Sequence, residues 1–139
     1  MKIKTENELY ILREGGKRLA EILYKISEKV APGISTLELD KYAEELVLAS
    51  GGTPSFKGYS TRGARFSYPA TICTSINDEI VHAIPGPRAL KSGDILGIDI
   101  GMRWEGLYTD MAITVPVGAI DEKSQKLIEV TRASLNAGI

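Results

Sequence analysis

The chain has 139 residues, of which 43% are hydrophobic and 25% charged, with a formal net charge of −1. These values are usual for one soluble globular domain and exclude a disordered or fibrous protein. Acidic and basic residues are interspersed, and no Lys/Arg run exceeds two, so nucleic-acid contact is not expected. No stretch approaches the roughly eighteen apolar residues of a membrane helix, and the single cysteine, Cys73, fits a reducing cytoplasm.

Two helices are predicted near the N-terminus. Residues 5–8 (TENE) and 35–38 (STLE) both have the form of a capping box, in which a hydroxyl and a glutamate satisfy backbone N–H groups of the first turn. In the first helix, apolar residues recur on one face at positions 19, 22, 23, 26 and 30, and Ala31-Pro32-Gly33 should end it. The second should bury Leu39, Tyr42, Ala43 and Leu46 and end at Gly51-Gly52.

A long surface loop is predicted over residues 51–68, which are rich in glycine, serine and aromatics. A β-hairpin should follow, with strands at 70–75 and 79–84 around an Asn77-Asp78 turn. Asp94 is better explained as a former of the turn over 91–94 than as a ligand. A final helix should begin at Asp121, with Leu127, Ile128, Thr131 and Leu135 on one face.

The most informative feature is a second hairpin that carries Asp99 and Asp110. Strand-like runs over 95–101 and 108–115 flank the segment Arg103-Trp104-Glu105-Gly106. With Trp104 and Glu105 at the tip, Asp99 lies directly opposite Asp110. Two carboxylates about 5 Å apart repel by about 3 kcal/mol at an effective dielectric of about 20.

The hairpin can relieve this repulsion in two ways, by taking up a proton or by binding a multivalent cation. Gly97 and Gly101 flank Asp99 and leave room above the strand, which favours a cation. Two other interpretations of this hairpin stay open. The charges could be solvated on an exposed strand face, or Gly106 could create a three-residue loop with a bulge and separate them.

Three ordered phrases, TSINDEIVHAIPG, KSGDILGIDIG and GLYTDMAIT, resemble the first half of type I methionine aminopeptidases, metalloenzymes of the pita-bread fold. The resemblance covers nearly the whole chain and includes the phrase PGIST. It implies an α+β fold with antiparallel β-hairpins packed against helices, which is half of a pita-bread fold. Residues 1–139 are accordingly expected to be a single domain, the N-terminal portion of a peptidase domain that is truncated.

The resemblance also implies an activity, the metal-dependent removal of the N-terminal methionine from nascent proteins whose second residue is small. The cofactors would be two divalent metal ions, of Co, Mn, Fe or Zn, which the family uses to hydrolyse the first peptide bond. By position, Asp99 chelates one ion and Asp110 bridges both. The family's other three protein ligands, one histidine and two glutamates, belong to the second half of the fold.

Four further residues match the substrate site of the family. His82 in VHAIPG matches the histidine that hydrogen-bonds the substrate and steadies the tetrahedral intermediate. Cys73 and Tyr68 match positions that line the methionine pocket. Tyr59 matches the outer pocket wall, next to residues 60–67, which look inserted relative to the family's usual spacing.

With only two of the five ligands, this chain is expected to bind metal weakly, to have little peptidase activity and to expose an apolar face. A separate C-terminal half would then be a partner. Glu122 and Glu129 on the final helix are expected to be solvated surface charges. The alternatives are a non-catalytic pita-bread module that binds peptides or protein partners, and a proline-specific relative of the same fold.

Overall fold

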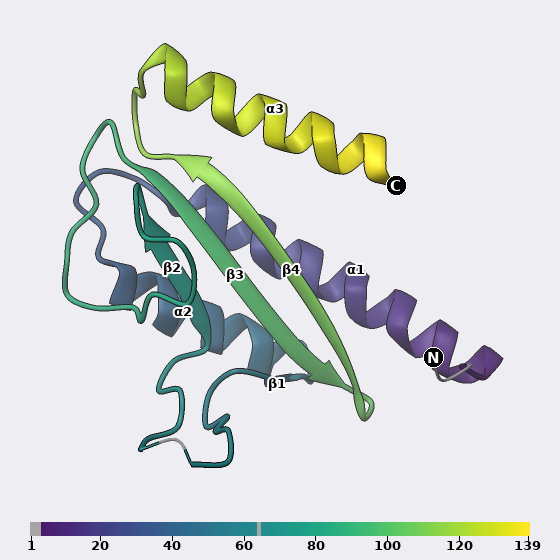
Figure 1. Ribbon diagram of the computed structural model, residues 1–139. Coiled ribbons are helices and arrows are strands. Elements are labelled where there is room, and N and C mark those ends of the chain that lie inside the picture. Colours follow the sequence, from purple (N-terminus) through teal and green to yellow (C-terminus); the bar gives the residue numbers. More distant parts are fainter. Residues whose placement is uncertain (1–3, 64) are drawn as a thin grey trace.

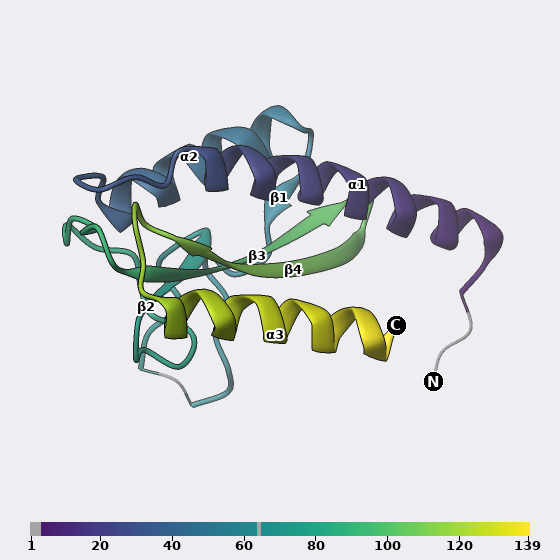
Figure 2. The same cartoon turned by 90° about the horizontal axis from the view of Figure 1, so that it is seen from above.

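The structure, a computed structural model, describes residues 4–63 and 65–139. Two helices, α1 (Glu6–Glu28) and α2 (Thr36–Ala49), cover one face of a four-stranded antiparallel sheet, and α3 (Glu122–Gly138) lies over the other face (Figures 1 and 2). The sheet contains β1 (Thr53–Pro54), β2 (Ile72–Ile76), β3 (Ile95–Trp104) and β4 (Leu107–Pro116). The predicted α+β class is confirmed.

Both N-terminal helices begin at the predicted capping boxes. The Thr5 hydroxyl accepts from the Glu8 N–H at 3.2 Å, and the Ser35 hydroxyl accepts from the Glu38 N–H at 3.2 Å. α1 ends at Glu28, three residues before the predicted stop at Ala31. The third helix also begins as predicted, because the Asp121 carboxylate accepts from the Ser124 N–H at 2.7 Å.

Strand β3 lies at the centre of the sheet. β4 pairs with one edge of β3 along its whole length, while β2 and β1 share the other edge and pair with different parts of it. Because side chains alternate between faces, every second residue of β3 enters the core against α1 and α2. These residues, Leu96, Ile98, Ile100 and Met102, have no solvent exposure.

The register of the β3–β4 hairpin differs from the prediction. Trp104 pairs with Leu107, so the tip is Glu105-Gly106 rather than Trp104-Glu105, and Arg103 does not pair with Gly106. Both tip residues have positive φ, 48° at Glu105 and 83° at Gly106, as a two-residue turn of type I′ requires. The prediction that Asp99 and Asp110 lie directly opposite each other is therefore wrong.

Two other local predictions need correction. Residues 79–84 do not form the return strand of a hairpin; β2 pairs with β3, and Ala83 meets β2 only through its carbonyl, which accepts from the Thr74 N–H at 3.0 Å. The predicted loop over 51–68 contains β1, which pairs with the far end of β3.

Helix α3 buries none of its residues, and its apolar side chains Leu127, Val130 and Leu135 are exposed. The apolar face expected toward a second half of the fold stays a prediction. Glu122 and Glu129 are exposed, as predicted. Among residues 4–63 and 65–139, no helix combines the length and the apolar character needed to cross a membrane.

Candidate active site

The sheet face opposite the core carries both aspartates. Asp99 lies between Cys73 on β2 and Ala112 on β4, and Asp110 lies opposite Gly101, the second residue after Asp99. The shift from the predicted register is two residues, and side chains alternate with a period of two, so the aspartates still share a face. They are diagonal neighbours instead of direct partners. The Cα atoms of diagonal neighbours in an antiparallel pair are about 7–8 Å apart.

Gly101 makes room for this arrangement. A Cβ atom at this position would lie 2.0 Å from Ser55 Oγ, 2.9 Å from Phe56 Cε1 and 3.0 Å from Asp110 Oδ2. A side chain at 101 would therefore occupy the space that the segment after β1 and the Asp110 carboxylate now share. At Gly97, the other predicted flank, a Cβ would meet the Ser75 carbonyl oxygen at 3.5 Å and Ser75 Cβ at 3.8 Å, both ordinary contact distances.

The two carboxylates differ in their surroundings. Asp110 is exposed, whereas Asp99 is half-buried and its Oδ1 is fully enclosed without a hydrogen-bond partner. Burial, and then the charge of Asp110, raise the pKa of Asp99, while His82 acts in the opposite direction. An enclosed carboxylate oxygen with no donor is a costly feature that a bound cation would relieve.

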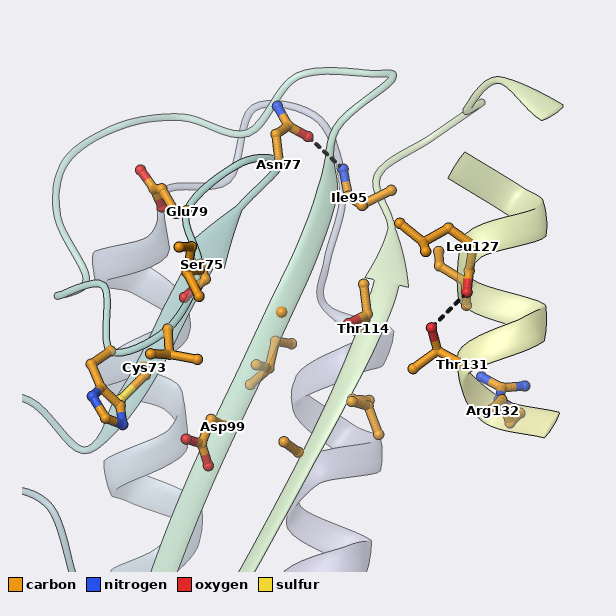
Figure 3. Close-up of a pocket in the computed structure, with 18 of the residues that line it drawn as sticks. Cys73, Ser75, Asn77, Glu79, Ile95, Asp99, Thr114, Leu127, Thr131 and Arg132 are labelled. Atoms are coloured by element: carbon orange, nitrogen blue, oxygen red, sulfur yellow. Dashed lines mark hydrogen bonds between the residues drawn. The ribbon is translucent and has the colours of Figure 1, made fainter. Parts of the chain in front are cut away.

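A cavity of about 530 Å³ lies between this face and α3 (Figure 3). Three of the predicted site residues, Cys73, His82 and Asp99, line it, together with Leu127, Thr131 and Arg132 of α3 among others. Tyr59, Tyr68 and Asp110 do not line this cavity. In Figure 3, Asp99 on β3 and Cys73 on β2 lie on the side of the cavity away from α3.

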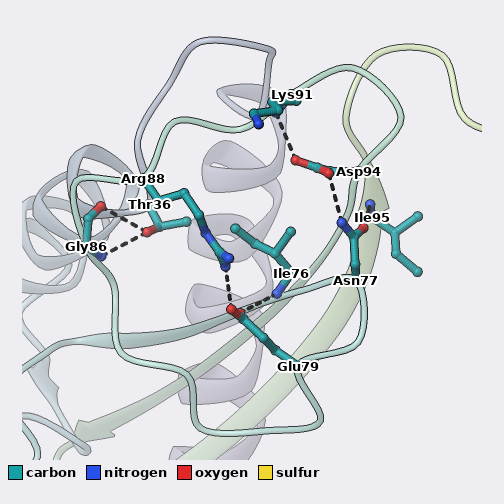
Figure 4. A network of polar contacts seen from close by, with 9 residues as sticks. All are labelled: Thr36, Ile76, Asn77, Glu79, Gly86, Arg88, Lys91, Asp94 and Ile95. Carbon is teal, nitrogen blue, oxygen red and sulfur yellow. Dashed lines mark hydrogen bonds and ion pairs between the residues drawn. The ribbon is translucent and has the colours of Figure 1, made fainter.

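His82 belongs to the irregular segment 77–88, which several contacts hold in place. The backbone of His82 has φ of 60°, a left-handed conformation that costs a residue with a side chain about 1–2 kcal/mol. Glu79 accepts from the Ile76 N–H at 2.8 Å and from Arg88 Nη2 at 2.5 Å, and Thr36 exchanges two hydrogen bonds with Gly86 (Figure 4). The segment is thereby fixed on both sides of His82.

Cys73 and Tyr68 lie close to this segment. The Cys73 thiol is buried, and burial raises its pKa, so it is a neutral thiol at neutral pH. The half-buried Tyr68 packs its ring edge-to-face on Phe56 at 6.4 Å, and its hydroxyl lies 3.0 Å from the Ile72 carbonyl oxygen and 3.3 Å from that of Ala83. Tyr59 is exposed.

One structurally important residue near the site, Asp40 of α2, was not predicted from the sequence. It is 7% exposed, and its Oδ1 accepts from the N–H groups of Thr71 and Ile72 at 2.8 and 3.0 Å, which fixes the start of β2. Burial raises the pKa of Asp40 despite these two bonds. A signal existed, because position 40 lies beside Leu39 and Ala43 on the apolar face of the helix, where a carboxylate needs donors.

An open sheet face with two carboxylates, backed by two helices, is the arrangement expected of a metallopeptidase half, and residues 11–139 match metallopeptidase family M24. The chain therefore belongs to metallopeptidase family M24, and its fold is half of a pita-bread fold. Divalent metal cofactors are characteristic of that family.

Within the family, the chain is similar to bacterial methionine aminopeptidases. It is 44% identical over 137 residues to the Clostridium perfringens enzyme, covering 99% of this chain and 53% of the relative. It is 46% identical over 136 residues to methionine aminopeptidase 1 of Bacillus subtilis, covering 98% and 52%. The chain thus spans about half the length of the curated relatives it matches.

Solved structures agree with this placement. The crystal structure of methionine aminopeptidase from Rickettsia prowazekii matches with a TM-score of 0.93 and 33% identity over 100% of this chain and 54% of that one. Aminopeptidase P of Escherichia coli matches with a TM-score of 0.77 at 20% identity, which shows the shared fold alone.

The described residues fit part of a metal site. Asp99 and Asp110 offer hard oxygen ligands on one face, and Oδ1 of Asp99 has no hydrogen-bond partner within the chain. Within 4–63 and 65–139, however, no three His, Cys, Asp or Glu side chains are grouped as a metal ion would need. Two protein ligands hold a divalent ion more weakly than a full set does.

Proposed function

We propose that this chain contributes to metal-dependent removal of the N-terminal methionine from newly made proteins, by hydrolysis of the first peptide bond. The proposal rests on its similarity to methionine aminopeptidases along almost its whole length. The observation that carries the site is the enclosed, unpartnered Oδ1 of Asp99 on the same open face as Asp110.

In this proposal Asp99 and Asp110 hold the metal, which we take to be two divalent ions of Co, Mn, Fe or Zn. When bound, such ions polarise the scissile carbonyl and lower the pKa of a water nucleophile. The role of this chain's own residues is to place Asp99 in the wall of the cavity, to hold Asp110 on the same sheet face, and to line the remaining walls.

His82 is proposed to act on the substrate as the catalytic residue. It lines the cavity together with Asp99, and an imidazole can donate a hydrogen bond to charge that develops on the scissile amide. Cys73 is proposed to contact the methionine side chain, since a thiol and a thioether are both soft and polarizable. Tyr68 is proposed to form part of the same pocket wall as Cys73, and Tyr59 to form the outer wall.

Metal titration tests the site directly. Isothermal titration of the 139-residue chain with Mn²⁺ should show weak binding, and Asp99→Asn and Asp110→Asn should each reduce the affinity at least tenfold, since each removes a charged ligand. Asp78→Asn is the matched control, because Asp78 is exposed in a turn outside the carboxylate face. Equal affinity in all four proteins would contradict the proposal.

Peptide hydrolysis tests the activity of the chain by itself. With Mn²⁺ or Co²⁺ and a Met-Ala-Ser peptide, we expect little or no release of methionine from the isolated chain, because two carboxylates do not complete the ligand set. Robust cleavage by the purified chain of verified mass would show that this expectation is wrong. Peptide binding that needs no metal ion would favour the non-catalytic peptide-binding alternative.

A further inference from the structure

The backbone at His82 needs outside support. His82 adopts φ of 60° within an exposed segment that has no regular secondary structure, and Val81 and Ile84 beside it are exposed. A left-handed φ is uncommon outside glycine, and although histidine adopts it more often than most residues, as asparagine and aspartate do, the local sequence alone does not impose it. A non-glycine residue persists in this region of φ when its surroundings determine it.

The support reaches the next residue, Ala83. Its carbonyl oxygen accepts from the Thr74 N–H of β2 at 3.0 Å and lies 3.3 Å from the Tyr68 hydroxyl. That hydroxyl also lies 3.0 Å from the Ile72 carbonyl oxygen, so its one proton bridges β2 and the His82 segment. Among the described residues, Tyr68 is the only one whose side chain hydrogen-bonds to Ala83.

Tyr68 is itself held firmly. Its N–H donates to the Tyr59 carbonyl at 2.8 Å, its carbonyl accepts from the Gly58 N–H at 2.8 Å, and its ring packs on Phe56. The hydroxyl points at two backbone carbonyls, and the residue does not line the 530 Å³ cavity. A rigid aromatic ring with its hydroxyl on backbone oxygens is suited to fixing a neighbouring segment.

We infer that Tyr68 is a positioning residue, whose hydroxyl fixes Ala83 and thereby holds His82 in its left-handed conformation beside Asp99 and Cys73. This inference rests on the proposed role of His82 for its functional meaning. It assigns to the hydroxyl a task separate from any contact of the ring with a methionine side chain.

The test is Tyr68→Phe, which keeps the ring and removes only the hydroxyl. His82 is the only histidine, so its imidazole and backbone signals are unambiguous in NMR spectra of the metal-free chain. The intraresidue HN–Hα Overhauser effect, strong only at positive φ, should weaken at His82. The Thr74 amide should exchange about fivefold faster, the equivalent of about 1 kcal/mol for one hydrogen bond.

Two references separate positioning from general stabilisation. Tyr24→Phe makes the same chemical change on an exposed part of α1 and should leave His82 and Thr74 unchanged. The amide of Ile98, at the centre of β3, should keep its exchange rate in Tyr68→Phe. An unchanged His82 signal, or equal acceleration at Thr74 and Ile98, would overturn the inference.

A measurement on the unaltered chain covers the case in which the variant does not fold. The Tyr68 hydroxyl proton should exchange with solvent at least tenfold more slowly than that of Tyr24, because it is engaged with two carbonyls. Equal rates would contradict the inference. Neither metal nor peptide enters these measurements, so failure of the proposed function would not be mistaken for failure of this one.

Discussion

The two faces of strand β3 have opposite requirements although they alternate residue by residue. Leu96, Ile98 and Ile100 face the helices and are fully buried, whereas Gly97, Asp99 and Gly101 face the cavity side. The first set provides packing, and the second keeps space and charge available at a cost in stability. The contrast shows that one strand can be a core element and a ligand platform at once, because its period of two separates the roles.

The largest effect is expected on the helix-covered face. Ile100→Ala should lower the free energy of unfolding by about 2–5 kcal/mol, because it removes a fully buried side chain and leaves a cavity. Ile80→Ala is the control, since Ile80 is 91% exposed and should change stability by less than about 0.5 kcal/mol. Urea denaturation followed by circular dichroism measures both, and similar losses in the two variants would remove the distinction.

The second largest effect is a difference in stability between alanine substitutions at Gly101 and at Gly97, the two glycines of the open face. Gly101→Ala should destabilise the chain by about 1–3 kcal/mol and displace Asp110, because the new Cβ would overlap Ser55 and approach the carboxylate. Gly97→Ala should be nearly neutral, because its Cβ would meet its neighbour at 3.5 Å. Thermal unfolding and Mn²⁺ titration of both variants test this. If Gly97→Ala proves the more harmful, the account of the open face is wrong.

A third test addresses the cost of the enclosed carboxylate. In metal-free buffer, Asp99→Asn should raise the free energy of unfolding by about 1 kcal/mol, since it removes a charge that is half-buried and repelled by Asp110. Asp110→Asn should give a smaller gain because Asp110 is exposed. Urea denaturation in the presence of a chelator measures both changes, and a loss of stability in Asp99→Asn would contradict the explanation.

The smallest effect concerns Asp94, which directly precedes β3 and whose carboxylate, unlike that of Asp99, has hydrogen-bond donors. It accepts from Asn77 Nδ2 and from the Lys91 N–H, both at 2.9 Å, and these bonds lower its pKa below the ordinary 3.8 (Figure 4). A lowered pKa gives stability that is present above the ordinary value and is lost as pH falls through the folded value.

Asp94→Asn should therefore cost about 0.5 kcal/mol at neutral pH, because one of its two accepting oxygens is lost. The difference from the parent chain should shrink as pH falls from about 5 to about 3. Unfolding free energies across this range measure it. A difference that grows toward low pH would show that the sign of the pKa shift is wrong.

Local signals predicted a large part of this fold. The three helix starts follow from Thr5, Ser35 and Asp121, because a cap depends only on residues within one turn. The shared face of Asp99 and Asp110 was also predictable, since an error of two residues in register preserves it. The register itself was readable from Gly106, which suits the second position of a type I′ tip.

Features that depend on distant partners were not predictable. Residues 79–84 have the alternation of a strand, but β2 pairs with β3, and contacts from Tyr68, Arg88 and Thr36 hold the segment in another path. The cavity requires α3 to lie over the open face, which no pattern within that helix specifies. The burial of Asp40 depends on the N–H groups of Thr71 and Ile72, which lie 31 and 32 residues away in the sequence.

The backbone closure at Tyr68 has a consequence for how this protein tolerates change. Gly58, Tyr59 and Tyr68 join the two ends of the segment between them through main-chain hydrogen bonds at 2.8 Å. Because its two ends are paired in this way, the loop between Tyr59 and Tyr68 should tolerate insertions and deletions. A change in loop length costs little entropy and transmits little strain to the sheet. Relatives with shorter or longer segments here could share one carboxylate platform, and a peptide epitope inserted after Ser60 would leave Asp99 and Asp110 undisturbed.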